Sequence, residues 1–425
     1  MSELAIFGGR KIRTTNFPSQ NTYNENEKEA LKRVFNFGRP SGYRANKGPH
    51  SMGGPEIQGL ELSWSYKFNV NGQAIACNSA TSGLFIACAA IGLKQGDEVI
   101  VTPYSMTCSA TVPLWFGATP VFADVEEDYF CIDPKSVVSL ITEKTKAIIA
   151  VDIFGQPCDY SNLKSIIREA EEKYKKEIYL ISDCAQAPGS KYFDRYSGTI
   201  ADISVFSLNF GKHMTCGEGG MIVTNSGNLE NRCRLIMNHA ESVMNDIYDS
   251  GEESIHYNMI GLNLRMTEFQ AAVAREQLKK LDYNIETRRE NVMNLNIMLS
   301  QIPAITPAKI RCGCTHSYYV AAYLWDKSKA NSLHRDKFIE VVKAELTPRD
   351  GRDGEGVQIG CGYIKPIYQM PWRKDQEAIH RPVVESLYKE KLFLTIAHAP
   401  NSTTNDMIDI GKAFNKVWEY RSELV

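Results

Sequence analysis

The sequence has no long hydrophobic run: nowhere do about 18 apolar residues follow one another, so no membrane-spanning helix is expected. Its first residues, MSELAIFGGRKIRTT, lack the apolar stretch and the small-residue cleavage site of a secretion signal. It also lacks an excess of charge of one sign, because 48 Lys and Arg residues stand against 50 Asp and Glu residues, for a net charge of −2. A protein that holds nucleic acid through many phosphate contacts is strongly basic, so that class is excluded. We therefore expect a cytoplasmic protein that binds neither membranes nor nucleic acid.

The sequence also lacks the spacings typical of metal sites. Its 11 cysteines are scattered, and the one close pair, Cys312 and Cys314, has no second pair and no histidine pair at zinc spacing. We expect neither a bound metal nor disulfides, as is usual for reduced core thiols. No G-x-G-x-x-G follows the first predicted strand, which argues against a dinucleotide cofactor of the Rossmann type.

What the sequence does contain is a regular alternation of short apolar runs and amphipathic stretches. Runs such as EVIVTP, KAIIAVDI and IYLISDC alternate with helix-length segments such as YSNLKSIIREAEEKYKK. This alternation predicts an α/β fold with a mostly parallel, doubly wound sheet. The chain has 425 residues, against about 150 for a usual domain, and its pattern changes to long helices near residue 267. We predict an N-terminal arm (1–50), a large α/β domain (51–265) and a smaller α+β domain (266–425).

Three segments place polar residues directly after apolar runs, at the strand ends where open α/β sheets bind ligands. The first is CNSATSGLF, in which a predicted strand ends and a helix begins. Backbone N–H groups at such a helix start, with the hydroxyls of Thr81 and Ser82, suit a phosphate group. An ordinary N-cap explains the same hydroxyl residues, so this segment alone leaves both interpretations open.

The other two segments offer an acid and a lysine. Asp183 follows a predicted strand in LISDCAQA. It is either a helix cap, a metal ligand or the partner of a protonated ring nitrogen. No other carboxylates cluster near it, which argues against the metal ligand. Gln186 is placed to donate to the same site. Lys212 lies in a tight turn rich in Ser, Gly and Thr, within VFSLNFGKHMTCGEGGMIV. Burial favours the neutral amine that condenses with an aldehyde, and the alternative is a solvated turn lysine.

The order of these segments is the one that pyridoxal 5′-phosphate requires. A turn holds the phosphate, an acid keeps the pyridine nitrogen protonated, and a lysine binds the aldehyde and later moves protons. Three such features coincide by chance far more rarely than any one of them occurs. The sequence therefore predicts an enzyme that uses this cofactor.

The chain resembles the DegT/StrS-like sugar aminotransferases of the fold-type I pyridoxal-phosphate group. The resemblance covers nearly the whole sequence and includes GGPEI, NSATSGL, VDIFGQP, SDCAQAPGS, FSLNFGKHMTCGEGGMIVT and GLNLRMTEFQAAVAREQL. It implies that Lys212 binds the cofactor covalently, that Asp183 pairs with the ring nitrogen, and that Gln186 lies near the ring hydroxyl. It also implies three residues that hold the phosphate: Ala80, Thr81 and Ser207.

The resemblance further implies a homodimer with shared active sites, because Asn263 matches an asparagine that reaches the phosphate of the neighbouring subunit's cofactor. Two positions depart from the family pattern. Ala80 stands where the family usually has glycine, although the backbone donors remain. Met106, with Tyr104 nearby, stands where the family often stacks an aromatic ring on the cofactor, and a thioether covers a ring face as well.

Further residues match regions that line the substrate side in the family. They are His239, His316, Tyr318 and Tyr319, and each is equally explained as a hydrogen-bonded interior histidine or a packed tyrosine. Arg265 either contacts an anionic substrate or braces the dimer, and bracing is the preferred interpretation.

We predict an aminotransferase that moves an amino group from L-glutamate or L-glutamine to a keto-sugar. The family suggests a nucleotide-linked acceptor and a product for polysaccharide or secondary-metabolite biosynthesis. Some family members carry histidine in place of the lysine and dehydrate sugars, whereas here Lys212 is present and His213 merely follows it, which favours transamination. A dehydratase or lyase on the same scaffold, a cyclitol aminotransferase, and a cofactor-binding regulator without turnover stay open as alternatives.

Overall fold

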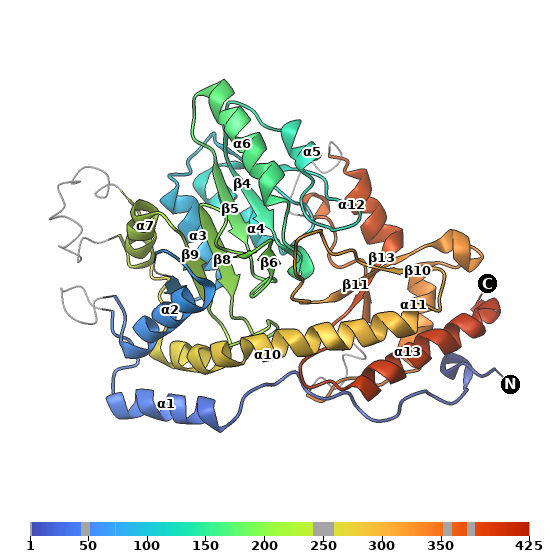
Figure 1. Cartoon of the computed structure of the whole chain (residues 1–425). Helices are drawn as coiled ribbons and strands as arrows, with labels where there is room; N and C mark the ends of the chain where they lie inside the picture. The colour runs from blue at the N-terminus through green and yellow to red at the C-terminus, as the bar shows by residue number, and fades with distance from the viewer. Residues whose placement is uncertain are drawn as a thin grey trace.

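The computed structural model describes residues 2–43, 52–72, 74–240, 259–351, 359–371 and 379–424. Its centre is a seven-stranded sheet in the order β1-β9-β8-β5-β4-β2-β3 (Figure 1). Adjacent strands from β8 to β3 pair in parallel, and β9 runs against the other six. The predicted α/β fold with a mostly parallel sheet is confirmed. The seven strands are β1 (Ile75–Cys77), β2 (Glu98–Val101), β3 (Thr119–Phe122), β4 (Thr145–Val151), β5 (Tyr179–Asp183), β8 (Ile203–Ser207) and β9 (Gly220–Val223).

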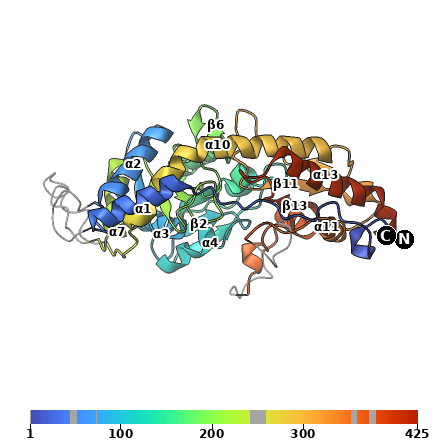
Figure 2. The ribbon, with the colours of Figure 1, turned by 90° about the horizontal axis from the view of Figure 1, so that it is seen from below.

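Helices cover both faces of this sheet, because alternate side chains of a strand point to opposite faces. Val205 packs in one core with α3 (Ala80–Ala90) and α7 (Gly227–Met237). Its neighbour Phe206 packs in another core with α2 (Pro55–Phe68) and α10 (Glu268–Leu299). Figure 2 shows α2 and α10 on one side of the molecule and α3 on the other. The remaining elements of this part are α4 (Cys108–Thr111), α5 (Pro134–Val138), α6 (Tyr160–Tyr174) and the hairpin of β6 (Lys191–Tyr192) and β7 (Arg195–Tyr196).

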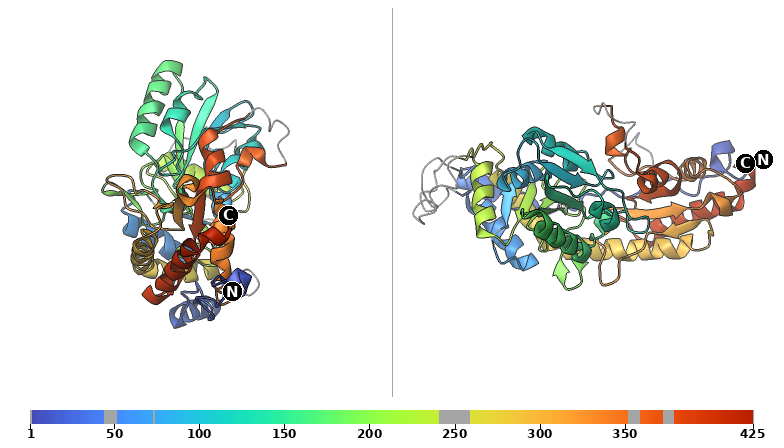
Figure 3. Two further views of the ribbon diagram at one scale, coloured as in Figure 1. Left: turned by 90° about the vertical axis from the view of Figure 1, so that its right-hand side faces the viewer. Right: turned by 90° about the horizontal axis from the view of Figure 1, so that it is seen from above.

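A second, antiparallel sheet of four strands follows α10, in the order β10-β11-β13-β12. Its core includes Phe338, Phe393 and Phe414, together with Leu4 and Phe17 from the start of the chain. The two chain ends therefore lie at the same end of the molecule (Figure 3). The elements of this part are β10 (Ile305–Pro307), β11 (Ala321–Trp325), α11 (Arg335–Ala344), β12 (Ile359–Cys361), α12 (Pro382–Ser386), β13 (Leu392–Thr395) and α13 (Thr404–Glu419).

Helix α10 contributes to both cores. Residues of its first half, such as Leu278, pack against α2, and residues of its second half, such as Leu295, pack under the four-stranded sheet. The domain boundaries at residues 50 and 265 stay a prediction; α10 begins just after the second boundary and packs in the cores of both parts. In the N-terminal segment, α1 (Glu25–Phe37) packs against α10 through Ala30 and Val34. Within the described part of the chain, no helix combines the length and apolar character that crossing a membrane demands.

Two of the sequence segments noted above, GGPEI and RMTEFQ, meet at the start of α2. The buried carboxylate of Glu268 accepts hydrogen bonds from the backbone N–H groups of Gly54 (2.7 Å), Glu56 (2.8 Å) and Ile57 (3.4 Å). These N–H groups belong to a helix start, where no partner within the helix is available. A Cβ on Gly54 would lie 2.6 Å from the Glu268 carboxyl carbon, so a larger residue there would displace this carboxylate from the helix start. The pair anchors α2 to α10.

Replacing Glu268 with alanine should therefore destabilise the protein by about 2–3 kcal/mol, because buried N–H groups lose a charged acceptor. Chemical denaturation of both proteins measures this difference. The control is Glu290→Ala on the exposed face of the same helix, which should change stability by less than about 0.5 kcal/mol. Equal stability of the Glu268→Ala variant and the original protein would contradict the assigned anchor.

Candidate active site

Seven of the eight predicted cofactor residues line one cavity of about 270 Å³. It lies at the carboxyl ends of β5 and β8, where Asp183 and Ser207 end adjacent parallel strands. Parallel strands place their ends at the same sheet edge, so residues distant in sequence converge there. The lining residues are Ser79, Ala80, Thr81, Ser105, Met106, Cys108, Asp183, Ala185, Gln186, Ser207, Asn209, Lys212, Glu218 and Tyr319.

The start of α3 forms one wall. Ser79 is the N-cap, and its hydroxyl accepts from the Ser82 N–H (3.1 Å) and lies 2.9 Å from the Ser82 hydroxyl. Ser82, which the sequence grouped with Thr81, is thus engaged in the cap and is not among the lining residues. The backbone N–H groups of Ala80 and Thr81 belong to the first helical turn, so they have no acceptor within the helix. A helix start of this kind attracts an anion.

A glycine of β9 fixes the position of this turn. A Cβ on Gly220 would lie 2.6 Å from the Ser79 carbonyl carbon and 2.8 Å from the Ala80 nitrogen. Both contacts are with backbone atoms, which cannot move aside as a flexible side chain can. The GEGGM segment therefore allows β9 to pack directly behind the turn.

The buried acid of the cavity is Asp183, with 4% of its surface exposed. Its Oδ2 accepts from the Ser109 hydroxyl (2.9 Å) and its Oδ1 accepts from the Ala185 N–H (3.1 Å). Burial raises the pKa of the Asp183 carboxyl, while the two hydrogen bonds and the charge of Lys212 oppose that rise. Such a carboxylate gains most from a positively charged partner inside the cavity.

The Lys212 ammonium lies 4.1 Å from the centre of the Tyr319 ring, a cation–π distance. Nearby, the Asn209 side-chain amide donates to Glu218 (2.8 Å) and holds the other side of the lysine turn. The cavity thus combines an amine, a buried acid and an anion-attracting helix start. Together these groups suit a compound that carries an aldehyde, a basic ring nitrogen and a phosphate.

Asn263 is the predicted residue that lies outside the cavity. It is exposed, and its backbone pairs with Asn238 in an isolated bridge. Met106 lines the cavity and is 52% exposed, whereas Tyr104 is fully buried and donates to the Gly362 carbonyl (3.0 Å).

The residues matched to the substrate side divide into two groups. Tyr319 lines the cavity, but the others are not among its lining residues. His316 is buried, accepts from the Tyr318 N–H (2.9 Å), and has its pKa lowered by burial to about 3, as an interior histidine does. His239 is exposed. Arg265 donates to the Asn238 side chain of its own chain (2.5 Å).

The sequence reasoning missed several residues of the site. Ser109 and Cys108 lie on α4, just after β2, and burial raises the pKa of the Cys108 thiol to about 11. Since β2 is a parallel strand of the same sheet, the rule used for Asp183 also points to the residues that follow it. Tyr363, whose hydroxyl accepts from the Gln186 amide (3.0 Å), comes from the second sheet and gave no such signal.

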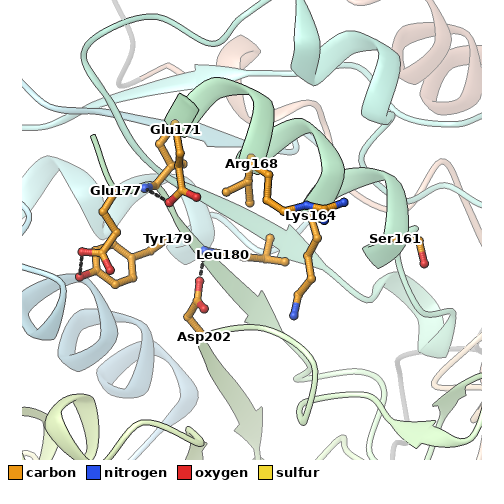
Figure 4. A pocket seen from close by; sticks show the side chains of 10 residues that line it. Ser161, Lys164, Arg168, Glu171, Glu177, Tyr179, Leu180 and Asp202 are labelled. Atoms are coloured by element: carbon orange, nitrogen blue, oxygen red, sulfur yellow. Dashed lines mark hydrogen bonds between the residues drawn. The ribbon is translucent and has the colours of Figure 1, made fainter. Parts of the chain in front are cut away.

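Another cavity, of about 510 Å³, lies at the opposite ends of the strands (Figure 4). Its polar groups serve the fold: Asp202 accepts from the Leu180 N–H (2.7 Å), and Glu171 accepts from the Ile178 N–H (2.9 Å). Lys164 lines it beside these acids. This cavity is larger but holds no comparable set of amine, buried acid and helix start.

Comparison with known proteins agrees with the geometry. The model of the DegT/DnrJ/EryC1/StrS aminotransferase family matches residues 44–415. The chain is similar to the L-glutamine:2-deoxy-scyllo-inosose aminotransferase of Streptoalloteichus tenebrarius, with 30% identity over 99% of both chains. It is also similar to the GDP-perosamine synthase of Vibrio cholerae, with 33% identity over 65% of this chain and 71% of that protein. Among solved structures, DesI in the presence of its TDP-sugar product matches with 25% identity and a TM-score of 0.81, over 100% of this chain and 98% of that chain.

The close packing behind the helix start predicts that Gly220→Ala destabilises the protein by about 1–3 kcal/mol, the usual cost of overpacking. Thermal or chemical denaturation measures the change. Gly227→Ala is the matched control, because nothing lies within 4 Å of its added Cβ, and it should be neutral or slightly stabilising. If Gly220→Ala unfolds like the original protein, the turn is not held from behind by β9.

Proposed function

Because the chain belongs to the DegT/DnrJ/EryC1/StrS aminotransferase family, we propose that it transfers an amino group from L-glutamine or L-glutamate to a keto-sugar or a related cyclic ketone. The observation that carries this proposal is the single cavity in which Lys212, Asp183 and the start of α3 meet. The names of the similar proteins support the class of reaction, since they include aminotransferases that act on cyclic polyols and a structure with a sugar product.

The residues of the cavity fit pyridoxal 5′-phosphate. The backbone at the start of α3, with Thr81 and Ser207, would hold the phosphate, and Asp183 would pair with the ring nitrogen. Gln186 would contact the ring oxygen, Met106 would cover a ring face, and Lys212 would bind the aldehyde. When bound, the cofactor supplies an electron sink, and it carries the amino group between the two half-reactions.

Two side chains of the protein carry the proton chemistry. Asp183 would stabilise a proton on the pyridine nitrogen, because a buried carboxylate favours a cation in contact with it. Lys212, which lines the same cavity, would hold the aldehyde and, as a free amine, would move a proton to and from the α-carbon of the amino donor. The Tyr319 ring, 4.1 Å from the Lys212 nitrogen, would favour a lysine side chain that stays at the cavity.

For the acceptor, we place a carbocyclic keto-polyol ahead of a nucleotide-linked keto-sugar. The cyclitol aminotransferase is 30% identical over practically the whole chain, including the N-terminal segment, whereas the GDP-perosamine synthase aligns with about two thirds of it. DesI also covers the whole chain, but at a lower identity of 25%. The nucleotide-linked acceptor remains the second candidate, supported by the sugar-nucleotide names among the relatives.

The active protein is proposed to be a homodimer. Asn263 is exposed and lies apart from the cavity of its own chain, as a residue that serves a neighbouring subunit would. Exposed apolar side chains lie next to it in sequence: Ile260 is 89% exposed and Leu262 is 44% exposed. A second copy would cover them.

The amino-donor step predicts a spectral change. Protein loaded with pyridoxal 5′-phosphate should show a visible absorption band that L-glutamine or L-glutamate bleaches as the cofactor takes up the amino group. Lys212→Ala should lose this band and lower turnover by at least about 10³-fold, since it removes the proton-transfer group. Lys144→Ala, at an exposed position, should behave as the original protein. A Lys212→Ala variant with normal activity would contradict the assignment.

The acceptor step predicts the product. Protein aminated with glutamine should convert a keto-cyclitol such as 2-deoxy-scyllo-inosose to its amine, detected by mass spectrometry, faster than it converts a nucleotide-linked keto-sugar. The reverse order would favour the nucleotide-linked acceptor. Loss of water from a sugar without any amino donor would support the dehydratase alternative instead.

A further inference from the structure

The side-chain amide of Gln186 is held from two separate parts of the chain. Its Oε1 accepts from the Phe154 N–H (2.8 Å), just after β4. Its Nε2 donates to the Tyr363 hydroxyl (3.0 Å), just after β12 of the second sheet. The side chain is 2% exposed and lines the cavity.

These two contacts decide which end of the amide is the donor. A backbone N–H can only donate, so the atom that faces Phe154 must be the amide oxygen, and the nitrogen must face Tyr363. The nitrogen carries a second proton that is not used by Tyr363. Gln186 therefore offers the cavity an N–H donor, which favours a negatively charged oxygen on a bound ring.

The backbone of Tyr363 is unusual. Among the described residues, the other non-glycine residues with positive φ have values of 50° to 66°, whereas Tyr363 has φ of 130°. The smaller values belong to the left-handed helical region that side chains reach at modest cost, but 130° belongs to a region populated almost only by glycine. A bulky residue stays there only where its surroundings fix it, and such positions concentrate at functional sites.

The surroundings of Tyr363 do fix it. The Tyr104 hydroxyl donates to the carbonyl of the preceding Gly362 (3.0 Å), and the Gly362 N–H donates to the Leu392 carbonyl (2.7 Å). The Tyr363 ring packs edge-on against Phe154, with ring centres 5.0 Å apart, and against Tyr104, at 5.9 Å. Burial raises the pKa of the Tyr363 hydroxyl, which keeps it neutral.

We infer that Tyr363 is a positioning residue, which rests on the proposed function: it holds Gln186 so that its amide N–H faces the ring oxygen of the cofactor. The strained backbone at Tyr363 is retained because this hydroxyl must reach from the segment after β12 of the second sheet to Gln186 in the turn after β5 of the large sheet. The contact between Gln186 and the cofactor thereby depends on the position of the second sheet.

Titration of the cofactor-free protein with pyridoxal 5′-phosphate tests this inference, with the dissociation constant and the pH midpoint of the visible band as readouts. The variants are Tyr363→Phe, which keeps the ring and removes one oxygen, Gln186→Ala, and the double variant. The control is Tyr368→Phe on the same segment, whose hydroxyl donates to Glu385 (2.8 Å), away from Gln186.

Tyr363→Phe should weaken cofactor binding by about 5- to 10-fold, the effect of losing one hydrogen bond. It should also raise the pH midpoint of the band, because a less well oriented N–H stabilises the deprotonated ring oxygen less. The double variant should be no weaker than Gln186→Ala, and Tyr368→Phe should stay within about 2-fold of the original protein.

Two results would overturn the inference while leaving the proposed function intact. One is a Tyr363→Phe variant that matches the original protein in both readouts. The other is a double variant whose effect is the product of the two single effects, which would mean that Tyr363 does not act through Gln186. An original protein that forms no band at all would instead overturn the proposed function itself.

Discussion

The proposed chemistry depends on one buried carboxylate. Asp183 ends β5 with 4% of its surface exposed, and the hydrogen bonds described for it come from neutral donors, Ser109 and Ala185. Neutral donors only partly offset the cost of removing an ion from water, so the ionised form is favoured when a cation joins it. Lys212 brings a positive charge to the same cavity, and a protonated ring nitrogen would bring one into direct contact. This requirement links the fold to the function, because the sheet edge is where such a partner has access to Asp183.

The parts of the site that follow a strand were accessible from the sequence. Asp183 and the turn at Ala80 each come directly after an apolar run, and the rule that ligands gather at the carboxyl ends of strands needs only the topology. Ser207, in contrast, was implied by the family resemblance. The fold class followed from the same alternation. The direction of β9 did not, since its apolar run resembles those of the parallel strands although β9 is antiparallel to both of its neighbours, β1 and β8. Tyr363 was also inaccessible: 177 residues separate it from Gln186, and their contact depends on how the second sheet docks.

Several segments that resemble the aminotransferase family stabilise the fold through helix capping and close packing, and the residues described below take no part in the proposed chemistry. Glu268 caps α2, and a side chain at position 54 would displace its carboxylate. Gly155 of the VDIFGQP segment is a second case: it has φ of +105°, and a Cβ there would lie 2.7 Å from the Ser317 hydroxyl and 2.8 Å from the Tyr318 nitrogen. A glycine at this point therefore lets the segment of Tyr319 approach the end of β4 closely. Reading such motifs as catalytic would assign function to residues whose task is close packing.

The cavity is closed by two parts of the chain that reach it independently. Asp183 ends β5 and Lys212 lies between β8 and β9 of the large sheet, while Tyr319 precedes β11 and Tyr363 follows β12 of the second sheet. Tyr319 lines the cavity, and Tyr363 contacts it through Gln186. The Tyr319 N–H donates to the Phe154 carbonyl (2.8 Å), and the Phe154 N–H donates to Gln186, so both tyrosines are connected to the same short turn after β4. Any shift of the second sheet must therefore change the ring beneath Lys212 and the partner of Gln186 together. Since Lys212 and Gln186 would contact neighbouring groups of the proposed cofactor, the aldehyde and the ring oxygen, the docking of the second sheet would affect the environment of both groups.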